Sequence, residues 1–257
     1  SSHILAFKTL GIDKVLVKKK PVLVFYATGN EISDSKKIPI WKVRNSNGHY
    51  LSSLINNLPI TFKTQKILRD NDQKILIKEI KKHLKSNTNI IITSGAVSTG
   101  KFDFVPEIIK NFKLANSFKG VAIRPGKPIL FAKFKNKEKV FFGLPGNPIS
   151  SAACFRFFVF PFLFASLNIK KEKPFKAKLK NVFIKKKEFT RFIKGKISFS
   201  NKGLVEFEVL EGQESFRINS FTQANSWGFF PSGKSKFKKG QFIDCFTVLP
   251  RDEMLIN

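Results

Sequence analysis

From Pro21 onward, short continuous apolar runs alternate with stretches in which apolar residues recur three or four positions apart. The runs at 22–26 and 90–93 are rich in β-branched or aromatic residues, which is typical of buried strands. Two helical stripes lie between them, formed by Leu51, Leu54, Ile55 and Leu58 and by Ile77, Ile80 and Leu84. The pattern predicts a layered α/β domain, in which amphipathic helices cover a sheet.

The same alternation continues to about residue 170. A helix is expected around 105–111, and further strands at 121–123, 129–134 and 140–142. Asn147 and Pro148 occupy the positions of an N-cap and a first-turn proline, so a helix is expected to begin there. Its apolar stripe consists of Phe155, Phe158, Val159 and Phe162.

The pattern changes after the charged run at 170–174. Apolar and polar positions then alternate with a period of two, for example at 205–209 and 242–249, which is typical of half-buried strands. We therefore predict an α/β domain over residues 21–170, followed by a small all-β domain over residues 171–257, with the boundary near Lys171.

Composition narrows the class of protein. The chain has 257 residues, of which 42% are hydrophobic, enough to bury a core. The longest apolar stretch, 153–167, is interrupted by Arg156 and Pro161, so we expect no membrane span and a cytoplasmic location. Cys154 and Cys245 lie among apolar residues and are expected to be buried thiols. The three histidines show no zinc-ligand spacing.

The net charge of +29 and the pI near 10.2 have two explanations. Excess positive potential attracts nucleic acid or acidic membranes. Alternatively, an AT-rich genome favours codons for Lys, Phe, Ile and Asn, all abundant here. The lysines form short runs along the whole chain and no single basic arm. Nucleic acid is therefore not the expected partner.

Three loops that follow predicted strands carry groups suited to anions or metal ions. They are Thr28-Gly29-Asn30-Glu31, the small-residue turn 94–100 with Asp103, and Arg124-Pro125-Gly126-Lys127-Pro128. Ligands collect at the carboxyl ends of strands in open α/β sheets. The first two loops could equally be plain connectors. In the third, two prolines stiffen a loop with two cations, which suits a tetrahedral oxyanion.

Six segments together resemble the molybdopterin molybdenumtransferase family, known as MoeA in bacteria and as the gephyrin E-domain in animals. They are 27–31, 44–47, 69–70, 94–100 with 103–104, 124–128 and 142–150. The resemblance runs from about His3 to Pro250 and includes 212–215 and 224–225. Asn30 and Ala96 depart from the family pattern, which usually has Asp and Gly there. Relatives carry a further amino-terminal region, so residues 1–20 are expected to join to upstream domains that this chain lacks.

The resemblance implies that molybdate is inserted into adenylylated molybdopterin, giving molybdenum cofactor and AMP. It also implies Mg²⁺ as cofactor, with Glu31, Asp70 and Asp103 as metal ligands and catalytic residues. Carboxylate oxygens are the ligands that Mg²⁺ prefers. Asp70 has a competing interpretation as the N-cap of the following helix, with Gln73 as its capping-box partner.

The resemblance further assigns molybdate binding to Arg124, Lys127 and Ser150 of the α/β domain and to Arg191 and Ser215 of the β domain. Gly143, Gly146 and Asn147 are expected to shape the loop at a helix N-terminus near phosphate. The remaining expected substrate-binding residues are Thr28, Gly29, Asn47, Ser94, Gly95, Ser98, Gly100 and Pro128. Ser150 could instead be an ordinary first-turn helix residue, and Arg191 a solvated strand charge.

Three alternatives remain open from the sequence. A molybdopterin adenylyltransferase shares the α/β domain but usually lacks the β domain. A non-catalytic scaffold or polyanion-binding module would use the fold without the chemistry. The chain could also be inactive without the amino-terminal region, because the full-length family member is expected to be a homodimer with its active cleft between protomers.

Overall fold

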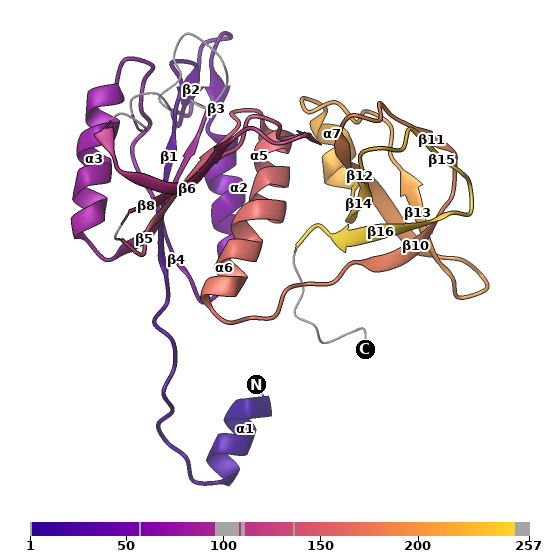
Figure 1. The fold of residues 1–257 in the computed structure, drawn as a ribbon, viewed down its shortest axis with the longest axis horizontal. Coiled ribbons are helices and arrows are strands. Elements are labelled where there is room, and N and C mark those ends of the chain that lie inside the picture. The colour runs from indigo at the N-terminus through magenta and orange to yellow at the C-terminus, as the bar shows by residue number, and fades with distance from the viewer. Residues whose placement is uncertain (1, 57, 96–107, 109–110, 136, 250–257) are drawn as a thin grey trace.

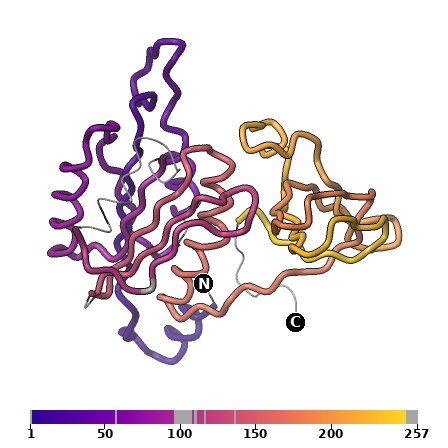
Figure 2. The backbone as a smooth tube through the Cα atoms, turned by 45° about the horizontal axis from the view of Figure 1, so that its top comes forward, coloured from indigo at the N-terminus to yellow at the C-terminus, as the bar shows by residue number. Residues whose placement is uncertain are grey.

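The computed structural model describes residues 2–56, 58–95, 108, 111–135 and 137–249. They form two lobes, each built around a six-stranded sheet (Figure 1). The second lobe lies on the side of the first that carries α5 and α6 and away from α3, as both views show (Figure 2). The predicted α/β domain followed by a β domain is confirmed.

The first sheet has the order β4-β1-β5-β9-β8-β6. Its parallel part consists of β4 (Thr61–Thr64), β1 (Val22–Ala27), β5 (Thr88–Ser94) and β9 (Val140–Leu144). All six residues of β1 and all five of β9 are buried. This is expected of central parallel strands that are covered on both faces.

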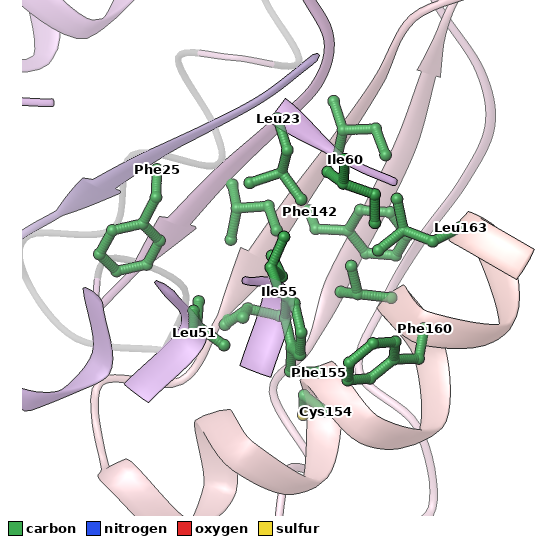
Figure 3. Packing of buried hydrophobic residues seen from close by; sticks show 14 of the residues in the cluster. Leu23, Phe25, Leu51, Ile55, Ile60, Phe142, Cys154, Phe155, Phe160 and Leu163 are labelled. Carbon is green, nitrogen blue, oxygen red and sulfur yellow. The ribbon is translucent and has the colours of Figure 1, made fainter. Parts of the chain in front are cut away.

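Helices cover both faces of this sheet. On one face, α2 (Ser46–Ile55) and the continuous helix 148–166 pack against side chains such as Phe25 and Phe142 (Figure 3). On the other face, Leu76 and Ile80 of α3 (Gln73–Lys85) are buried against Val24 and Ile91. The carboxyl ends of the parallel strands therefore open onto one edge, where the candidate residues lie.

The antiparallel edge differs from the prediction. β8 (Leu130–Phe134) pairs with β9, and β6 (Leu114–Lys119), which the pattern did not predict, pairs with β8. The predicted strand at 121–123 is instead β7 (Ile123–Arg124), and it joins the second sheet. A strand of only two residues has too short a hydrophobic pattern to indicate which sheet it joins.

The second sheet has the order β13-β10-β16-β14-β12-β7. Its strands are β10 (Phe175–Leu179), β12 (Thr190–Phe199), β13 (Val205–Val209), β14 (Ser226–Phe230) and β16 (Phe242–Thr247). β12 also pairs with β13, so these five strands close on themselves, and the first residues of β12 are left to pair with β7. Closure leaves few free strand edges. The interior includes Ile193, Phe207 and Phe230.

The helix that was predicted to begin after Asn147 extends to Ser166. It runs through α5 (Pro148–Cys154), a π-helical turn η1 (Phe155–Val159) and α6 (Phe160–Ser166) without a break. Pro161 does not end it, because the proline follows the π turn and stands in the first turn of α6. These 19 residues are long and apolar enough to cross a membrane, but 67% of the most apolar window is buried inside the protein. Within this fold the segment is a core helix.

The remaining elements are short or peripheral. α1 (Ser2–Thr9) has no buried residue and lies apart from both lobes (Figure 1). β2 (Ile32–Ser33) pairs with β3 (Val43–Arg44), and β11 (Phe183–Ile184) pairs with β15 (Lys236–Phe237). α7 (Ile218–Gln223) precedes β14. Cys154 and Cys245 are buried free thiols, as predicted, and burial raises the pKa of both.

Candidate functional site

The carboxyl ends of β1, β5 and β9 meet in one hydrogen-bonded cluster. The Thr28 hydroxyl donates to the Ser94 carbonyl at 2.8 Å. The Asn47 side-chain amide donates to the Ser94 hydroxyl and to the Gly146 carbonyl, both at 2.9 Å. The Gly95 amide donates to the Leu144 carbonyl at 3.0 Å. Five of the predicted substrate-binding residues therefore lie together.

Gly95 is required at the centre of this cluster. Its φ is +123°, a conformation that L side chains rarely adopt. A Cβ there would lie 2.2 Å from the Thr28 carbonyl oxygen and 2.6 Å from its hydroxyl. A Cβ on Gly146 would in turn come within 3.2 Å of the Gly95 Cα. The three loops approach so closely that only glycine fits between them, and the side chains of Thr28, Asn47 and Ser94 are buried at this contact.

The two described carboxylates of the predicted metal site lie on adjoining loops. Arg69 donates from Nη1 to the carbonyls of Gly29, Asn30 and Ile32, at 2.8 to 3.3 Å. The Asp70 amide donates to Asn30 Oδ1 at 3.3 Å. Arg69 thus holds the Glu31 loop against the Asp70 segment. Our site prediction did not include Arg69, although it belongs to the matched pair Arg69-Asp70.

The capping interpretation of Asp70 is wrong, because the N-cap of α3 is Asp72. The Asp72 carboxylate accepts a hydrogen bond from the Arg69 amide at 2.7 Å. Asp103, Ser98 and Gly100 fall outside the described residues. Within the described part of the chain, no three His, Cys, Asp or Glu side chains converge as metal ligands. Glu31 and Asp70 supply oxygen donors of the type that Mg²⁺ prefers.

The predicted cations come together where the two lobes meet. Arg124 on β7 stands directly opposite Arg191 on β12 in the parallel pairing of these strands. The Arg124 guanidinium lies 4.4 Å from the centroid of the Phe189 ring, and Lys127 Nζ lies 5.9 Å from the same centroid. Two charges of the same sign that face each other across a strand pair repel. This cluster of cations, in which Arg124 and Lys127 are exposed, is therefore suited to an anion.

The alternative interpretation of Arg191, as a solvent-exposed charge on a strand, is wrong. It is half-buried, and its Nε is buried without a hydrogen-bond partner. Burial lowers the pKa of Arg191, the charge of Arg124 lowers it further, and Glu214 raises it. An unpartnered buried donor costs about 1–3 kcal/mol, which a bound acceptor would recover.

The start of the helix 148–166 joins the hydrogen-bonded cluster to the cations. Ser150 is buried in the first turn of α5, and its carbonyl lies 3.6 Å from where a Cβ of Gly126 would be. Asn147 is the N-cap, as predicted, but its side chain makes no capping bond, and its Oδ1 is buried without a partner. Ser151 Oγ is also buried and unpartnered. Neutral polar groups therefore lie beside the cations.

One predicted loop residue belongs elsewhere. Gly143 is a buried residue inside β9, paired with Thr93 on one side and Leu130 on the other. The loop therefore begins after Leu144. Because Gly143 pairs with both neighbouring strands, it does not shape the loop as predicted.

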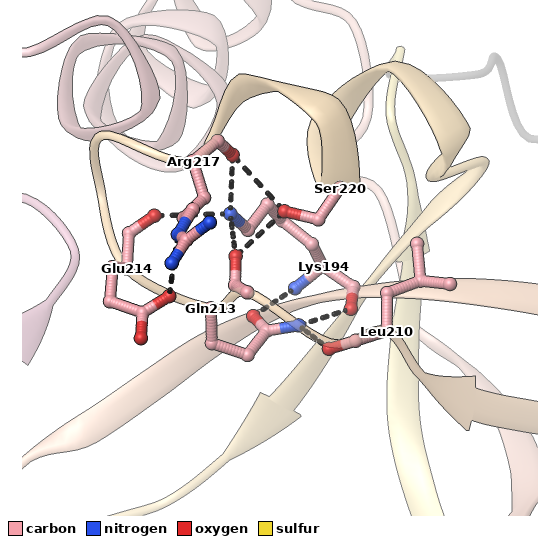
Figure 4. Close-up of polar contacts among 7 residues, drawn as sticks. Lys194, Leu210, Gln213, Glu214, Arg217 and Ser220 are labelled. Carbon is pink, nitrogen blue, oxygen red and sulfur yellow. Dashed lines mark hydrogen bonds and ion pairs between the residues drawn. The ribbon is translucent and has the colours of Figure 1, made fainter.

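Lys194 is a functional candidate that our sequence reasoning missed (Figure 4). It is only 1% exposed, and its Nζ donates to the carbonyls of Gly212, Glu214 and Arg217 at 2.7 to 3.2 Å. The Gln213 side chain bonds both the amide and the carbonyl of Lys194. Burial lowers the pKa of Lys194 to about 8. The lysine fixes the segment that carries Ser215, which is half-buried, to the strand that carries Arg191.

Comparisons with known proteins agree with this architecture. Residues 25–165 match the family model of a probable molybdopterin binding domain. Residues 176–252 match the MoeA C-terminal region, domain IV. The first match alone covers more than half of the chain, and the two together account for both lobes.

Relatives extend the match along nearly the whole chain. It is 32% identical over 254 residues to the molybdopterin molybdenumtransferase of Staphylococcus epidermidis, covering 96% of this chain and 59% of the relative. For a Staphylococcus aureus relative with the same name, identity is 34% over 249 residues, covering 93% and 57%. The chain thus spans about three-fifths of the length of these relatives.

Solved structures share the fold. The molybdopterin biosynthesis MoeA protein of Pyrococcus horikoshii gives a TM-score of 0.74 at 24% identity, covering 95% of this chain and 58% of that one. A molybdenum cofactor biosynthesis protein of Pyrococcus furiosus gives 0.68 at 20% identity, covering 95% and 74%. Taken with the two matched domains, these comparisons show that the chain belongs to the MoeA family of molybdopterin molybdenumtransferases and contains the family's molybdopterin-binding domain and domain IV.

Proposed function

We propose that this chain binds molybdate and adenylylated molybdopterin, and that it contributes to the insertion of molybdate with release of AMP. The observation that carries the proposal is the pairing of Arg124 and Arg191 from two lobes, with Lys127 over the same aromatic ring as Arg124. Molybdate is a doubly charged tetrahedral oxyanion, and an arginine can donate to two of its oxygens at once.

The same edge of the first sheet is suited to the phosphate groups of the nucleotide. The Asn47 side-chain amide donates to the Ser94 hydroxyl and to the carbonyl of Gly146, two residues before the helix that begins at Pro148. Neutral donors at such a position stabilise anionic oxygens without adding net charge. We place the phosphates of the adenylylated pterin along this cluster and molybdate at the adjoining cations.

We further propose that Glu31 and Asp70, together with Asp103, hold Mg²⁺. The support is that Arg69 holds the loops of the first two together and that both supply hard oxygen donors. Bound there, the ion would neutralise charge on phosphate oxygens as the phosphoanhydride is hydrolysed. Asn30 contributes a neutral amide oxygen at the same place, and it is already engaged with the Asp70 amide.

The first test is the substitution of Lys127 by Ala, followed by calorimetric titration with sodium molybdate. We expect the Kd to rise about tenfold, because one charge-assisted contact from an exposed lysine contributes about 1.4 kcal/mol. Arg191→Ala should weaken binding further, because this arginine is half-buried.

Lys202→Ala is the matched control, because Lys202 is an exposed lysine in the turn between β12 and β13. This control removes the same unit of net charge from the same protein. If Lys127→Ala and Lys202→Ala bind molybdate with equal affinity, the oxyanion pocket is not formed by this loop.

A further inference from the structure

Arg156 is a buried cation that connects the two lobes. It lies in η1 of the first lobe and is only 2% exposed. Its Nε donates to the carbonyl of Thr247 on β16 at 3.0 Å, across the boundary between lobes. Its Nη2 lies 2.8 and 2.6 Å from the two carboxylate oxygens of Glu172, in the segment that connects the lobes. One guanidinium of the first lobe therefore binds two other parts of the chain, β16 and the connecting segment.

Aromatic rings surround this cation and extend toward the cationic pocket. The guanidinium lies 5.3 Å from the centroid of the Phe157 ring and 5.6 Å from that of Phe246. Phe157 in turn stacks on Phe192 of β12, with centroids 3.8 Å apart and planes 10° apart. Phe192 immediately follows Arg191. Arg156 is thus linked through two stacked rings to the strand that presents Arg191 to Arg124.

Apolar packing alone does not hold this boundary. A cavity of about 190 Å³ lies here, lined by Arg156, Glu172 and mainly aromatic side chains that include Phe192 and Phe229. This space is open to solvent on one side, so the side chains that line it have fewer packing partners across the boundary. The hydrogen bonds of Arg156 to Thr247 and Glu172 therefore add to the stability of this boundary. The π turn is the local feature that places Arg156 here, because it shifts the helix register at residues 155–159.

We propose that Arg156 is a positioning residue that clamps the two lobes and so holds Arg191 opposite Arg124 at the oxyanion pocket. The proposal rests on the proposed function for the pocket itself. Arg156 and Ser150 stand six residues apart on one helix, about 9 Å along its axis. The clamp therefore acts through the arrangement of the lobes and not through contact with the anion.

The test compares Arg156→Ala and Arg156→Lys with Lys180→Ala. The last removes a cation from an ion pair with Glu208 that lies wholly inside the second lobe. Two readouts are taken on each folded variant. Hydrogen exchange is measured at the Thr190 amide, which donates to the Ala122 carbonyl across the boundary at 3.0 Å. Molybdate affinity is measured by calorimetry.

We expect Arg156→Ala to speed exchange at Thr190 at least tenfold and to raise the molybdate Kd at least tenfold. Arg156→Lys keeps the charge but loses the forked geometry, so it should fall between the wild type and Arg156→Ala. Lys180→Ala should change neither readout by more than twofold. Circular dichroism checks that each lobe remains folded.

The proposal is overturned if Arg156→Ala leaves exchange at Thr190 within twofold of the wild type, whatever happens to binding. It is also overturned if exchange rises while molybdate affinity stays unchanged, because the clamp would then not position the pocket. If the wild-type chain binds no molybdate at all, the proposed function fails. Exchange at Thr190 still decides in that case whether Arg156 clamps the lobes.

Discussion

Single residues account for the least predictable part of this site. Lys194 sits within a β-strand, where a lysine ordinarily projects its ammonium into water. Here the strand is enclosed by the segment 212–217, and the ammonium donates to three carbonyls of that segment. Removing it would take one hydrogen bond from each of these carbonyls, although the Ser220 hydroxyl still donates to those of Gly212 and Arg217 and the Arg217 amide still donates to that of Glu214. A hydrogen bond from a charged donor contributes about 1.5–3 kcal/mol to stability.

Lys194 also makes stability depend on pH. Its pKa is about 8 in the folded protein and 10.5 in the unfolded chain, because burial disfavours the charged form. Between these values the unfolded chain binds more protons, so the contribution of Lys194 to stability rises with pH, by at most about 1.4 kcal/mol per pH unit. Lys194→Met should be less stable than the wild type and should lack this rise.

Urea unfolding at pH 7.5 and at pH 9.5 measures both effects in wild type and variant. Lys196→Met serves as the control, because Lys196 is an exposed residue of the same strand. The free energy of unfolding of the wild type, minus that of Lys194→Met, should be larger at pH 9.5 than at pH 7.5. An unchanged difference would contradict the lowered pKa of Lys194.

At the scale of elements, periodicity predicted the buried strands well and their partners poorly. The runs at 22–26 and 90–93 became β1 and β5 because central parallel strands are apolar throughout. Hydrophobic pattern does not encode which sheet a short strand joins, so it did not indicate that β7 pairs with β12 of the second sheet. The helical stripe Phe155, Phe158, Val159 and Phe162 was predicted, but the π turn at 155–159 has no sequence signal.

The loop that carries Lys127 depends on its packing against α5. Gly126 has a φ of +105°, and a Cβ there would lie 2.5 Å from the Cys154 sulfur. Gly126→Ala should therefore push the loop off the helix, lower the melting temperature by several degrees and weaken molybdate binding. Cys154→Ala removes the obstructing atom, so the double variant should recover part of both losses.

A double-mutant cycle of the two substitutions measures this coupling, and we expect about 1 kcal/mol or more. Gly120→Ala is the control for backbone strain alone. Its φ is +78°, and its Cβ would meet only the Lys127 carbonyl at 3.6 Å. Losses that are strictly additive in Gly126→Ala/Cys154→Ala would show that the sulfur does not set the position of the loop.

At the scale of the whole molecule, the cluster of Arg124, Lys127 and Arg191 forms only because the two lobes meet. A motif in the sequence identified Arg124 and Lys127, and the family resemblance assigned Arg191 to the same anion, but no sequence pattern indicated that Arg124 and Arg191 pair across two strands. That arrangement depends on β7 leaving the first lobe to pair with β12. It depends equally on the apolar contact of Ile123 and Ile149 with Phe192 and Trp227. Sequence patterns describe single elements, whereas this contact is a property of their assembly.

The net charge of +29 is a property of the whole molecule. It predicts that anions bound only through surface charge depend on salt differently from an anion bound at Arg191. Exposed lysines occur on elements of both lobes, for example Lys78 and Lys81 on α3 and Lys196 on β12. Mixed-sequence DNA should bind at low salt, through counterion release, and should be lost near physiological ionic strength. Molybdate binding at the half-buried Arg191 should weaken much less over the same range, because screening is smaller for partly buried charges. Fluorescence anisotropy with labelled DNA and calorimetry with molybdate, each at 50 and 200 mM salt, measure the two slopes. DNA affinity that persists at 200 mM salt would instead indicate a dedicated polyanion surface.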